Sequence, residues 1–385
     1  MRVLIAFDKF KDSLTARQAC EVVARTLREL HPDWTVVASP FTDGGDGFAP
    51  LLTEAAGGHL LSVPSSGPRS EPLTAPLGLM PAGRVAPQAR RLLGWDHLAD
   101  AATIAVIEMA SASGLALVPH AERSPWTTTS RGTGQLIRAA AEAGARAILL
   151  GVGGSATHDL GLGALSALGY EFRTGSGDKL RPPYPQTWAR LASVDGSALE
   201  SIPPIRIACD VTNPLLGDSG AAAIYGPQKG LKAEDREALD QQSARLASLL
   251  CRHCGKPESL AEEPGAGAAG GIAFGLVVGL GARLVPGADL VSAWMGLEAK
   301  LQAADIVITG EGQFDATSLT GKGPGGLALR AGALGKAIHI FAGRIALADP
   351  PYPLRCHAIT PEGMPLGEAL ATARENLSRS IRATF

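Results

Sequence analysis

The chain has 385 residues, more than one ordinary domain core accommodates, so its length predicts two domains. Its 35 basic and 37 acidic residues give a formal net charge of -2, and 5% of the residues are aromatic. This composition excludes the broad positive field and the aromatic stacking surface that nucleic-acid-binding proteins use. The five scattered cysteines are typical of a reducing compartment, so we predict a cytoplasmic protein.

The chain opens with a predicted strand, residues 3–7, and continues into a predicted helix. Thr15 and Gln18 have the spacing of a capping box, and the apolar residues after them recur on one helical face. Later apolar runs are likewise followed by glycine or an acid and then by a helical stretch; they are residues 145–152, 205–209, 305–309 and 337–342. This alternation predicts an α/β fold of parallel strands joined by crossover helices.

Two segments rich in proline and glycine, residues 63–87 and 174–204, predict loops or crossings. A helix is predicted over residues 366–381. Because the last strands and this helix have the style of the opening unit, we expect both chain ends to share one domain. The expected division is residues 1–63 with 288–385, and an inserted domain of residues 64–287.

One apolar stretch, residues 265–282, is uncharged and carries glycines at four-residue spacing. No Trp or Tyr flanks it, although such residues commonly mark membrane boundaries. Glycines also allow helices to approach closely in a soluble core. We therefore predict a buried helix and no membrane span.

Five links at strand ends carry polar side chains or glycine, and ligands in open parallel sheets bind at the carboxyl ends of strands. Glycine and aspartate are also ordinary turn formers, so each link alone has a purely structural alternative. The links are residues 8–11, 42–47, 153–157, 210–214 and 310–312.

Residues 151–156 match the pattern G-x-G-x-x-A between a predicted strand and a predicted helix, and Glu171 follows at about the distance that a dinucleotide site requires. A nicotinamide site is therefore one alternative. More generally, glycine N–H groups at a helix N-terminus bind phosphate, and hydroxyl side chains add donors. We predict phosphate binding by this loop, with a bare tight turn as the other alternative. Its candidate residues are Gly153, Gly154, Ser155, Ala156 and Thr157.

Residues 310–322 form a second candidate phosphate site. The segment is not a Walker A loop, because Ala316 replaces the first glycine and Gly323 follows Lys322 where Ser or Thr is required. Gly310 and Gly312 are candidates for phosphate contact, and Glu311 and Asp315 for oxygen ligands of Mg²⁺. The alternative for Lys322 is a solvated loop charge.

Two further residues are candidates for contact with a substrate. Arg131 follows a cluster of hydroxyl residues before a predicted helix, a composition suited to binding a carboxylate; the alternative is a capping cluster with an exposed arginine. Asp210 ends a predicted strand, where its carboxylate can accept a proton from a substrate hydroxyl. Its alternative is a structural turn before Asn213 and Pro214.

Together these motifs resemble the bacterial-type glycerate kinase family, which phosphorylates D-glycerate with ATP. The resemblance runs nearly from end to end and is carried by seven strings in order. They are TDGGDGF at 42–48, IEMASASGLALVP at 107–119, TTSRGTG at 128–134, GVGGSATHDLGLGALSALG at 151–169, ACDVTNPLLGDSGAAAIYGPQKG at 208–230, PGAGAAGG at 264–271 and TGEGQFDATSLTGKGP at 309–324.

The resemblance implies a Rossmann-like parallel-sheet domain formed by both chain ends, an inserted α/β domain and an active site in the cleft between them. It also implies ATP with Mg²⁺, D-glycerate as acceptor, and a monomer or homodimer. Asp210, Arg131 and Lys322 are its catalytic candidates. The remaining candidates are Asp8, Lys9, Ser130, Arg131 and Asn213 for the substrate, and Glu311, Asp315, Asp43 and Asp46 for the metal.

Four positions depart from the family pattern: Lys9 in place of Ser, Asp46 in place of Glu, His158 in place of Asn, and Gln313 in place of Arg. One cation is lost at 313 and another is gained at 9, so Lys9 is a candidate replacement. The functional alternatives are a kinase of a related hydroxy acid and a nicotinamide-dependent oxidoreductase.

Overall fold

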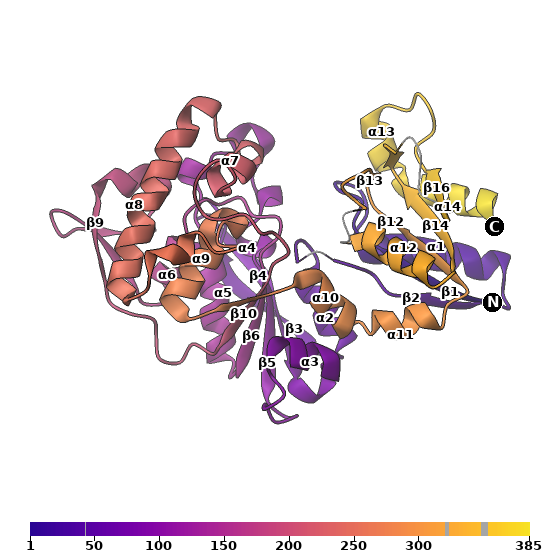
Figure 1. Ribbon diagram of the computed structural model, residues 1–385, viewed down its shortest axis with the longest axis horizontal. Helices are drawn as coiled ribbons and strands as arrows, with labels where there is room; N and C mark the ends of the chain where they lie inside the picture. Colours follow the sequence, from indigo (N-terminus) through magenta and orange to yellow (C-terminus); the bar gives the residue numbers. More distant parts are fainter. Residues whose placement is uncertain (43, 320–322, 348–352) are drawn as a thin grey trace. The chain divides into compact units, whose positions relative to one another are not determined.

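The computed structural model describes residues 1–42, 44–319, 323–347 and 353–385. The chain forms two compact units: unit 1 contains Met1–Asp43 and Val291–Phe385, and unit 2 contains Gly44–Leu290 (Figure 1). The sequence placed the first boundary after residue 63, whereas residues 44–63 group with unit 2.

The sheet of unit 1 is parallel and is built from both ends of the chain. Its strand order is β16-β14-β12-β1-β2, and its neighbouring strands pair in parallel throughout. This confirms the expected parallel sheet. Its strands are β1 (Arg2–Phe7), β2 (Thr35–Ala38), β12 (Ile306–Gly310), β14 (Ala337–Ala342) and β16 (Leu354–Ala358).

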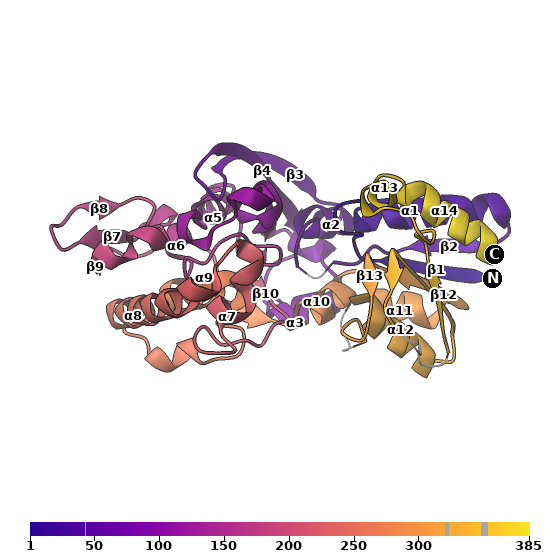
Figure 2. The ribbon, with the colours of Figure 1, turned by 90° about the horizontal axis from the view of Figure 1, so that it is seen from above.

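Helices cover both faces of this sheet: α1 (Ala16–Leu30) and α14 (Ala373–Thr384) lie on one face, and α11 (Leu297–Gln302) and α12 (Gly323–Ala333) on the other (Figure 2). The predicted capping box of α1 is present, because Thr15 and Gln18 exchange hydrogen bonds of 2.9 and 3.2 Å. The prediction of a single helix over residues 366–381 is wrong. The chain forms α13 (Leu366–Ala371) and α14, which are separated by Thr372 in a non-helical conformation. Two short strands, β13 (Gln313–Phe314) and β15 (Arg344–Ile345), pair with each other.

Unit 2 contains a mixed sheet with the order β11-β10-β6-β5-β4-β3. The parallel part is β5 (Thr103–Glu108), β6 (Ala147–Gly151), β10 (Ile205–Ala208) and β11 (Arg283–Val285). The antiparallel strands β3 (His59–Ser66) and β4 (Pro72–Pro81) form a hairpin where the sequence predicted loops. Proline misled that prediction. Pro64 lies in the edge strand β3, and Pro72 and Pro76 lie in the part of β4 that does not pair with β5, so these prolines interrupt no ladder on that side.

A small antiparallel sheet extends unit 2, with the order β8-β7-β9. Its strands are β7 (Glu171–Thr174), β8 (Lys179–Leu180) and β9 (Leu191–Asp195), so part of the second predicted loop segment is also strand. The principal helices of unit 2 are α2 (Phe48–Ala55), α3 (Pro87–Leu93), α4 (Ala110–Ser113), α5 (Arg131–Glu142), α6 (Leu162–Ala167), α7 (Ala221–Tyr225), α8 (Arg236–Cys254) and α9 (Ala268–Leu280). The helix α10 (Gly287–Trp294) begins in unit 2 and ends in unit 1.

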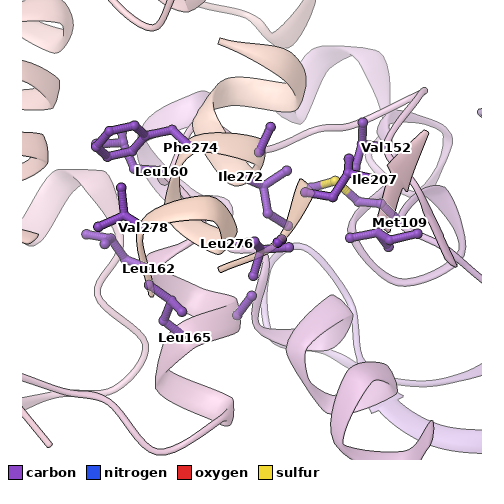
Figure 3. Packing of buried hydrophobic residues seen from close by; sticks show 14 of the residues in the cluster. Met109, Val152, Leu160, Leu162, Leu165, Ile207, Ile272, Phe274, Leu276 and Val278 are labelled. Carbon is purple, nitrogen blue, oxygen red and sulfur yellow. The ribbon is translucent and has the colours of Figure 1, made fainter. Parts of the chain in front are cut away.

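The apolar, glycine-rich stretch forms α9 in the core of unit 2, where Ile272 and Leu276 pack against residues such as Ile207 and Val152 (Figure 3). A Cβ atom on Gly275 would lie 2.0 Å from the carbonyl oxygen of Leu160, so glycine is required for this close packing. The buried-helix prediction is confirmed for the part of α9 that follows Gly271, whereas Ala269, Gly270 and Gly271 have positive φ angles and kink the segment before it. Across the described residues, no helix combines the length and apolarity that a membrane crossing requires.

Candidate functional site

The polar links lie at the carboxyl edges of two different sheets. In unit 2, the last residues of β5, β6, β10 and β11 lie in one row, because Glu108 pairs with Gly151, Gly151 with Ala208, and Ala208 with Val285. The links at residues 153–157 and 210–214, which follow β6 and β10, therefore start side by side. In unit 1, Phe7 pairs with Gly310, so the links at 8–11 and 310–312 are neighbours there.

Two glycine-rich links of unit 2, residues 44–47 and 153–157, pack against each other beside these strand ends. The N–H group of Gly153 donates to the carbonyl oxygen of Gly44 over 3.0 Å, and a Cβ atom on Gly153 would lie 2.7 Å from the nitrogen of Gly45. Gly154 is exposed and has a φ of +69°. A Cβ atom on it would lie 3.5 Å from Oδ2 of Asp46. The structure thus brings the candidate metal ligand Asp46 beside the candidate phosphate loop.

The helix N-terminus that was expected to complete this phosphate site is already occupied by the protein. The carboxylate of Asp159 accepts hydrogen bonds of 3.2 Å from the N–H groups of Gly161 and Gly163, where α6 begins. Two N–H groups of the loop itself are also engaged: Gly153 donates to Gly44, and Ala156 donates to Ser113 over 2.9 Å. Any phosphate at this loop must therefore be held by its exposed surface and by charges close to it.

Two other helices of unit 2 have the same arrangement. Oε2 of Glu108 accepts from the N–H group of Ala49 over 2.9 Å in the first turn of α2. Oδ2 of Asp210 accepts from the N–H group of Ala288 over 2.9 Å in the first turn of α10. Internal carboxylates stabilise these helix ends through the helix dipole, as a bound anion otherwise would.

Asp159 also holds the TTSRG segment against the loop. It is fully buried, and its Oδ2 accepts from the N–H group of Ser130 over 2.6 Å and from the Ser130 hydroxyl over 2.9 Å. Burial raises the pKa of Asp159, and the hydrogen bonds from Ser130 and from the α6 end oppose that rise. Ser130, a predicted substrate residue, is itself 0% exposed, and its oxygen accepts from the N–H group of Ala164. Its hydroxyl thus serves the interior of unit 2.

Lys229 is a residue that the sequence reasoning missed. It is 1% exposed, and its Nζ donates to Oγ of Ser155 over 3.0 Å and to the carbonyl oxygen of Thr157 over 2.6 Å. Burial lowers its pKa to about 7, and the negative charge of Asp159 opposes that shift. The amino group of Lys229 therefore lies inside the protein directly against the candidate phosphate loop, and with a pKa of about 7 it gains or loses its positive charge near neutral pH. Its only sequence signal is the string GPQKG, because a lysine after proline and glutamine is ordinarily a surface residue.

Lys229 also sets the role of the Ser155 hydroxyl. A protonated lysine can only donate, so Oγ of Ser155 is the acceptor in this contact. The proton of the Ser155 hydroxyl is consequently directed to another acceptor.

His158, one of the departures from the family pattern, lies in the interior. Its Nε2 is 3.1 Å from Oγ of Ser243 on α8, and its side chain is 0% exposed. Burial, with a smaller contribution from the Lys229 charge, lowers its pKa to about 3. The histidine is therefore neutral, and its partner on α8 accommodates the departure.

The predicted substrate residues do not gather in one place. Asn213 uses both ends of its amide inside unit 2, donating to the carbonyl oxygen of Ser219 over 2.8 Å and accepting from the Tyr225 hydroxyl over 2.6 Å. Arg131 donates from Nη1 to Oγ of Ser166 on α6 over 3.3 Å. It lines a cavity together with residues of β7 and β8, whereas Asp210 bonds to the first turn of α10. The strands β7–β9 and the helix α10 lie at opposite ends of unit 2 (Figures 1 and 2).

The candidate residues of unit 1 lie in more open turns. Oδ1 of Asp8 accepts from the N–H group of Lys9 over 2.6 Å, and Glu311 is half-buried after β12. Asp315 forms a local turn: Oδ1 accepts from the N–H group and the hydroxyl of Thr317, and Oδ2 accepts from Nε2 of Gln313 over 3.0 Å. These hydrogen bonds, that of the Thr317 hydroxyl first, lower the pKa of Asp315 to about 2.

Position 313, where this chain has Gln in place of the family's Arg, has an arginine near it in space that the sequence did not indicate. Arg344 is the register partner of Gln313 in the β13–β15 pair. Parallel partners in register point to the same face, so an arginine occupies the face that position 313 shares. Lys322 and Asp43 lie outside the described residues.

Magnesium fits this chain as an ion that arrives with a nucleotide. Among the described residues, no group of three or more Asp, Glu, His or Cys side chains could hold a metal. Mg²⁺ in kinases needs only one or two carboxylates, because phosphate oxygens and waters complete its shell. Glu311 and Asp46 suit that limited role better than Asp315, whose two oxygens already accept three hydrogen bonds.

Comparisons with known proteins all point to glycerate kinases, and the matches extend along nearly the whole chain. Residues 3–385 match the model of the glycerate kinase family. A glycerate kinase of Bacillus subtilis is 38% identical, over 99% of this chain and 96% of its own. A glycerate 2-kinase of Escherichia coli is 35% identical, over 100% of this chain and 98% of its own. The crystal structure of a protein described as glycerate kinase 2 from Salmonella typhimurium superposes with a TM-score of 0.76 at 36% identity, covering 100% of this chain and 97% of that one.

Proposed function

The chain belongs to the glycerate kinase family, and from this premise we propose that it transfers the γ-phosphoryl group of ATP to a hydroxyl of D-glycerate. The observation that carries the site assignment is the loop at residues 153–157. Its exposed glycine surface lies at the carboxyl edge of a sheet, with the buried charge of Lys229 against it. This combination favours an anion with several oxygens, such as a phosphoryl group.

Phosphoryl transfer depends mainly on positioning and on positive charge near the equatorial oxygens of the transition state. In our proposal, the exposed Gly154 allows the phosphoryl group to approach the backbone, and the Ser155 hydroxyl donates to it. Gly153 keeps the loop packed against Gly44 and Gly45. Lys229 contributes through its charge and by holding Ser155 in place. An anionic phosphoryl group beside the loop would favour the protonated form of Lys229, and because this residue is shielded from water, its charge would then act more strongly than that of a surface lysine.

Asp210 is the residue that we propose as proton acceptor. The glycerate hydroxyl oxygen attacks the γ-phosphorus, its proton moves to the Asp210 carboxylate, and ADP leaves with the electrons of the broken P–O bond. The position of Asp210 at the carboxyl end of β10, next to the link that follows β6, supports this role. Its hydrogen bond from Ala288 fixes the orientation of the carboxylate.

For the nucleotide, we propose the links of unit 1 that follow β1 and β12. Gly312 is the glycine that we propose for close approach to the backbone, and Asp8, Lys9 and Glu311 supply charged groups beside it. Gly310 is buried, and a Cβ atom on it would lie 1.7 Å from the carbonyl oxygen of Phe341, so this glycine serves the packing of the sheet. Lys322 and Asp43 keep the roles that the family resemblance assigns to them. Bound Mg²⁺ would neutralise charge on the phosphate oxygens, and Glu311 is the carboxylate of unit 1 that we propose for it. Asp46 of unit 2 stays a candidate from the sequence.

The nicotinamide alternative loses support from the contacts of Glu171. A dinucleotide site needs this acid to accept from a ribose hydroxyl. In the structure, its carboxylate instead pairs with Lys179 and Arg173 in the small sheet.

The test is ADP release in the presence of Mg²⁺ and ATP, measured with D-glycerate, L-glycerate and related hydroxy acids, each against a blank without acceptor. We expect turnover that depends on D-glycerate. Turnover with another acid and none with D-glycerate would contradict the proposed acceptor.

A further inference from the structure

Unit 2 contains a cavity that the proposed reaction does not use. It has a volume of about 240 Å³ and lies among α5, α6 and the strands β7 and β8. The polar residues that line it are Arg131, Ser166, Tyr170, Glu171, Lys179 and Arg181.

The lining of this cavity carries more positive than negative charge. Its three cations, Arg131, Lys179 and Arg181, face a single carboxylate, that of Glu171. That carboxylate is already shared, because it pairs with Lys179 and with Arg173 and lies 3.6 Å from Nη2 of Arg181. Glu171 therefore cannot also neutralise Arg131.

Of the three cations that line the cavity, Arg131 is the one whose charge is least neutralised by carboxylates. Among the residues that the structure describes, no carboxylate pairs with it, and its side chain makes one hydrogen bond, to Oγ of Ser166. Its guanidinium is half-buried, and burial together with the charges of Arg138 and Arg181 lowers its pKa. An arginine stays charged in such a place, so an anion in the cavity would relieve both its desolvation and the repulsion.

We propose that this cavity is a second anion site, and that its ligand is a small metabolite carrying a phosphate monoester. The two guanidinium groups present the planar donor forks that bind phosphate oxygens in pairs. The lining residues carry two more positive than negative charges, which matches a phosphate dianion better than a monocarboxylate. The cavity volume is sufficient for a phosphate group with a short carbon chain and is below that of a typical drug-sized pocket.

This site is separate from the proposed proton acceptor. The small sheet that contributes Glu171 and Lys179, and that Arg181 directly follows, lies at one end of unit 2. The helix α10, whose first turn binds Asp210, lies at the other end (Figures 1 and 2). A ligand in the cavity would therefore not compete with the acceptor at Asp210. The inference consequently replaces the substrate-carboxylate role that the sequence suggested for Arg131.

The test is isothermal titration calorimetry with inorganic phosphate as the probe, on protein saturated with Mg²⁺, ADP and D-glycerate. We expect millimolar binding by the wild type that weakens at least fivefold in Arg181→Gln and in Arg131→Gln. Arg190→Gln is the matched control, because Arg190 is an exposed arginine nearby in the chain that does not line the cavity. Arg190→Gln and Asp210→Asn should bind phosphate as the wild type does.

Equal phosphate affinity in the wild type and Arg181→Gln, or no heat of binding at all, would overturn the site. Arg181→Lys keeps the charge and should retain most of the affinity, which separates lost charge from damaged folding. Acetate provides the second arm of the experiment. If acetate binds as tightly as phosphate, the assignment of a phosphate monoester is wrong.

Discussion

The carboxyl edges of the two sheets carry similar strings of glycine, acids and hydroxyl residues, yet they use them differently. In unit 2, Asp159, His158 and Lys229 are at most 1% exposed, and each bonds to a segment distant in the chain: Asp159 to Ser130, His158 to Ser243 and Lys229 to Thr157. In unit 1, Asp315 and Gln313 lie in an open turn and bond to neighbours along the chain. Burial thus turns ligand-like residues of unit 2 into the framework of a loop, and the residues free to meet a ligand are those at its surface.

The largest expected effect tests whether Asp210 differs in kind from the buried carboxylates of unit 2. Asp210→Asn keeps an oxygen that can accept from Ala288 but removes the proton acceptor. We expect kcat to fall by roughly 10²- to 10⁴-fold, the usual contribution of a general base, with little change in Tm. Steady-state kinetics and thermal melting measure the two effects. If kcat is unchanged, Asp210 only caps α10 and belongs with Asp159.

The next comparison is between Asp159→Ala in unit 2 and Asp315→Ala in unit 1. Each carboxylate accepts several hydrogen bonds, but only that of Asp159 is fully buried. Removing it strands buried donors of Ser130, Gly161 and Gly163, so we expect a loss of about 3 kcal/mol or more in the free energy of unfolding. Asp315→Ala should change Tm much less, because water can replace its hydrogen bonds. Similar losses in chemical denaturation would contradict the contrast between the units.

Lys229 provides a test of the buried charge against the loop. Lys229→Met removes the charge at similar length, and we expect kcat to fall by about 10- to 100-fold, below the effect of deleting a direct transition-state donor. Lys229→Arg should recover part of the activity. A fall in stability without any change in kcat would assign Lys229 to structure alone.

The same residue has a signature in the pH dependence of stability. Its pKa falls from 10.5 to about 7 on folding, so the unfolded chain binds more protons between these values. The free energy of unfolding should therefore rise with pH over that window, by at most about 1.4 kcal/mol per pH unit, and Lys229→Met should remove this rise. Chemical denaturation at pH 7 and pH 8.5 measures the difference.

The smallest expected effect concerns His158. Its pKa falls from 6.5 to about 3 on folding, so the unfolded state gains protons first as the pH decreases, and stability should decline from pH 6.5 toward pH 3. His158→Asn does not titrate and can still bond to Ser243, so its Tm should fall less between pH 7 and pH 5 than that of the wild type. An equal fall in both proteins would show that His158 is not responsible for the acid sensitivity.

Much of the fold could be predicted because its signals are local. The capping box of Thr15 and Gln18 and the strand at residues 337–342 depend on neighbours in the chain, and both are present. The hairpin of β3 and β4 could not be predicted from proline content, because whether proline is tolerated depends on which stretch of a strand has a neighbour, and β4 pairs with β5 only over residues 78–81. The break at Thr372 likewise divides a helix whose apolar pattern continues on both sides.

For the candidate site, too, some features follow from local sequence and others only from tertiary packing. The sequence by itself determined the family, the α/β class and the segments that reach the carboxyl edges of the sheets, because strings and periodicities are properties of consecutive residues. The tertiary structure decided which of those residues are buried. Lys229 lies 74 positions from Ser155, and Asp159 lies 29 positions from Ser130, so no local pattern can reveal either contact. Burial is a property of the packed chain, and it is the packing that places the Lys229 amino group against the loop and the Asp159 carboxylate at the start of α6.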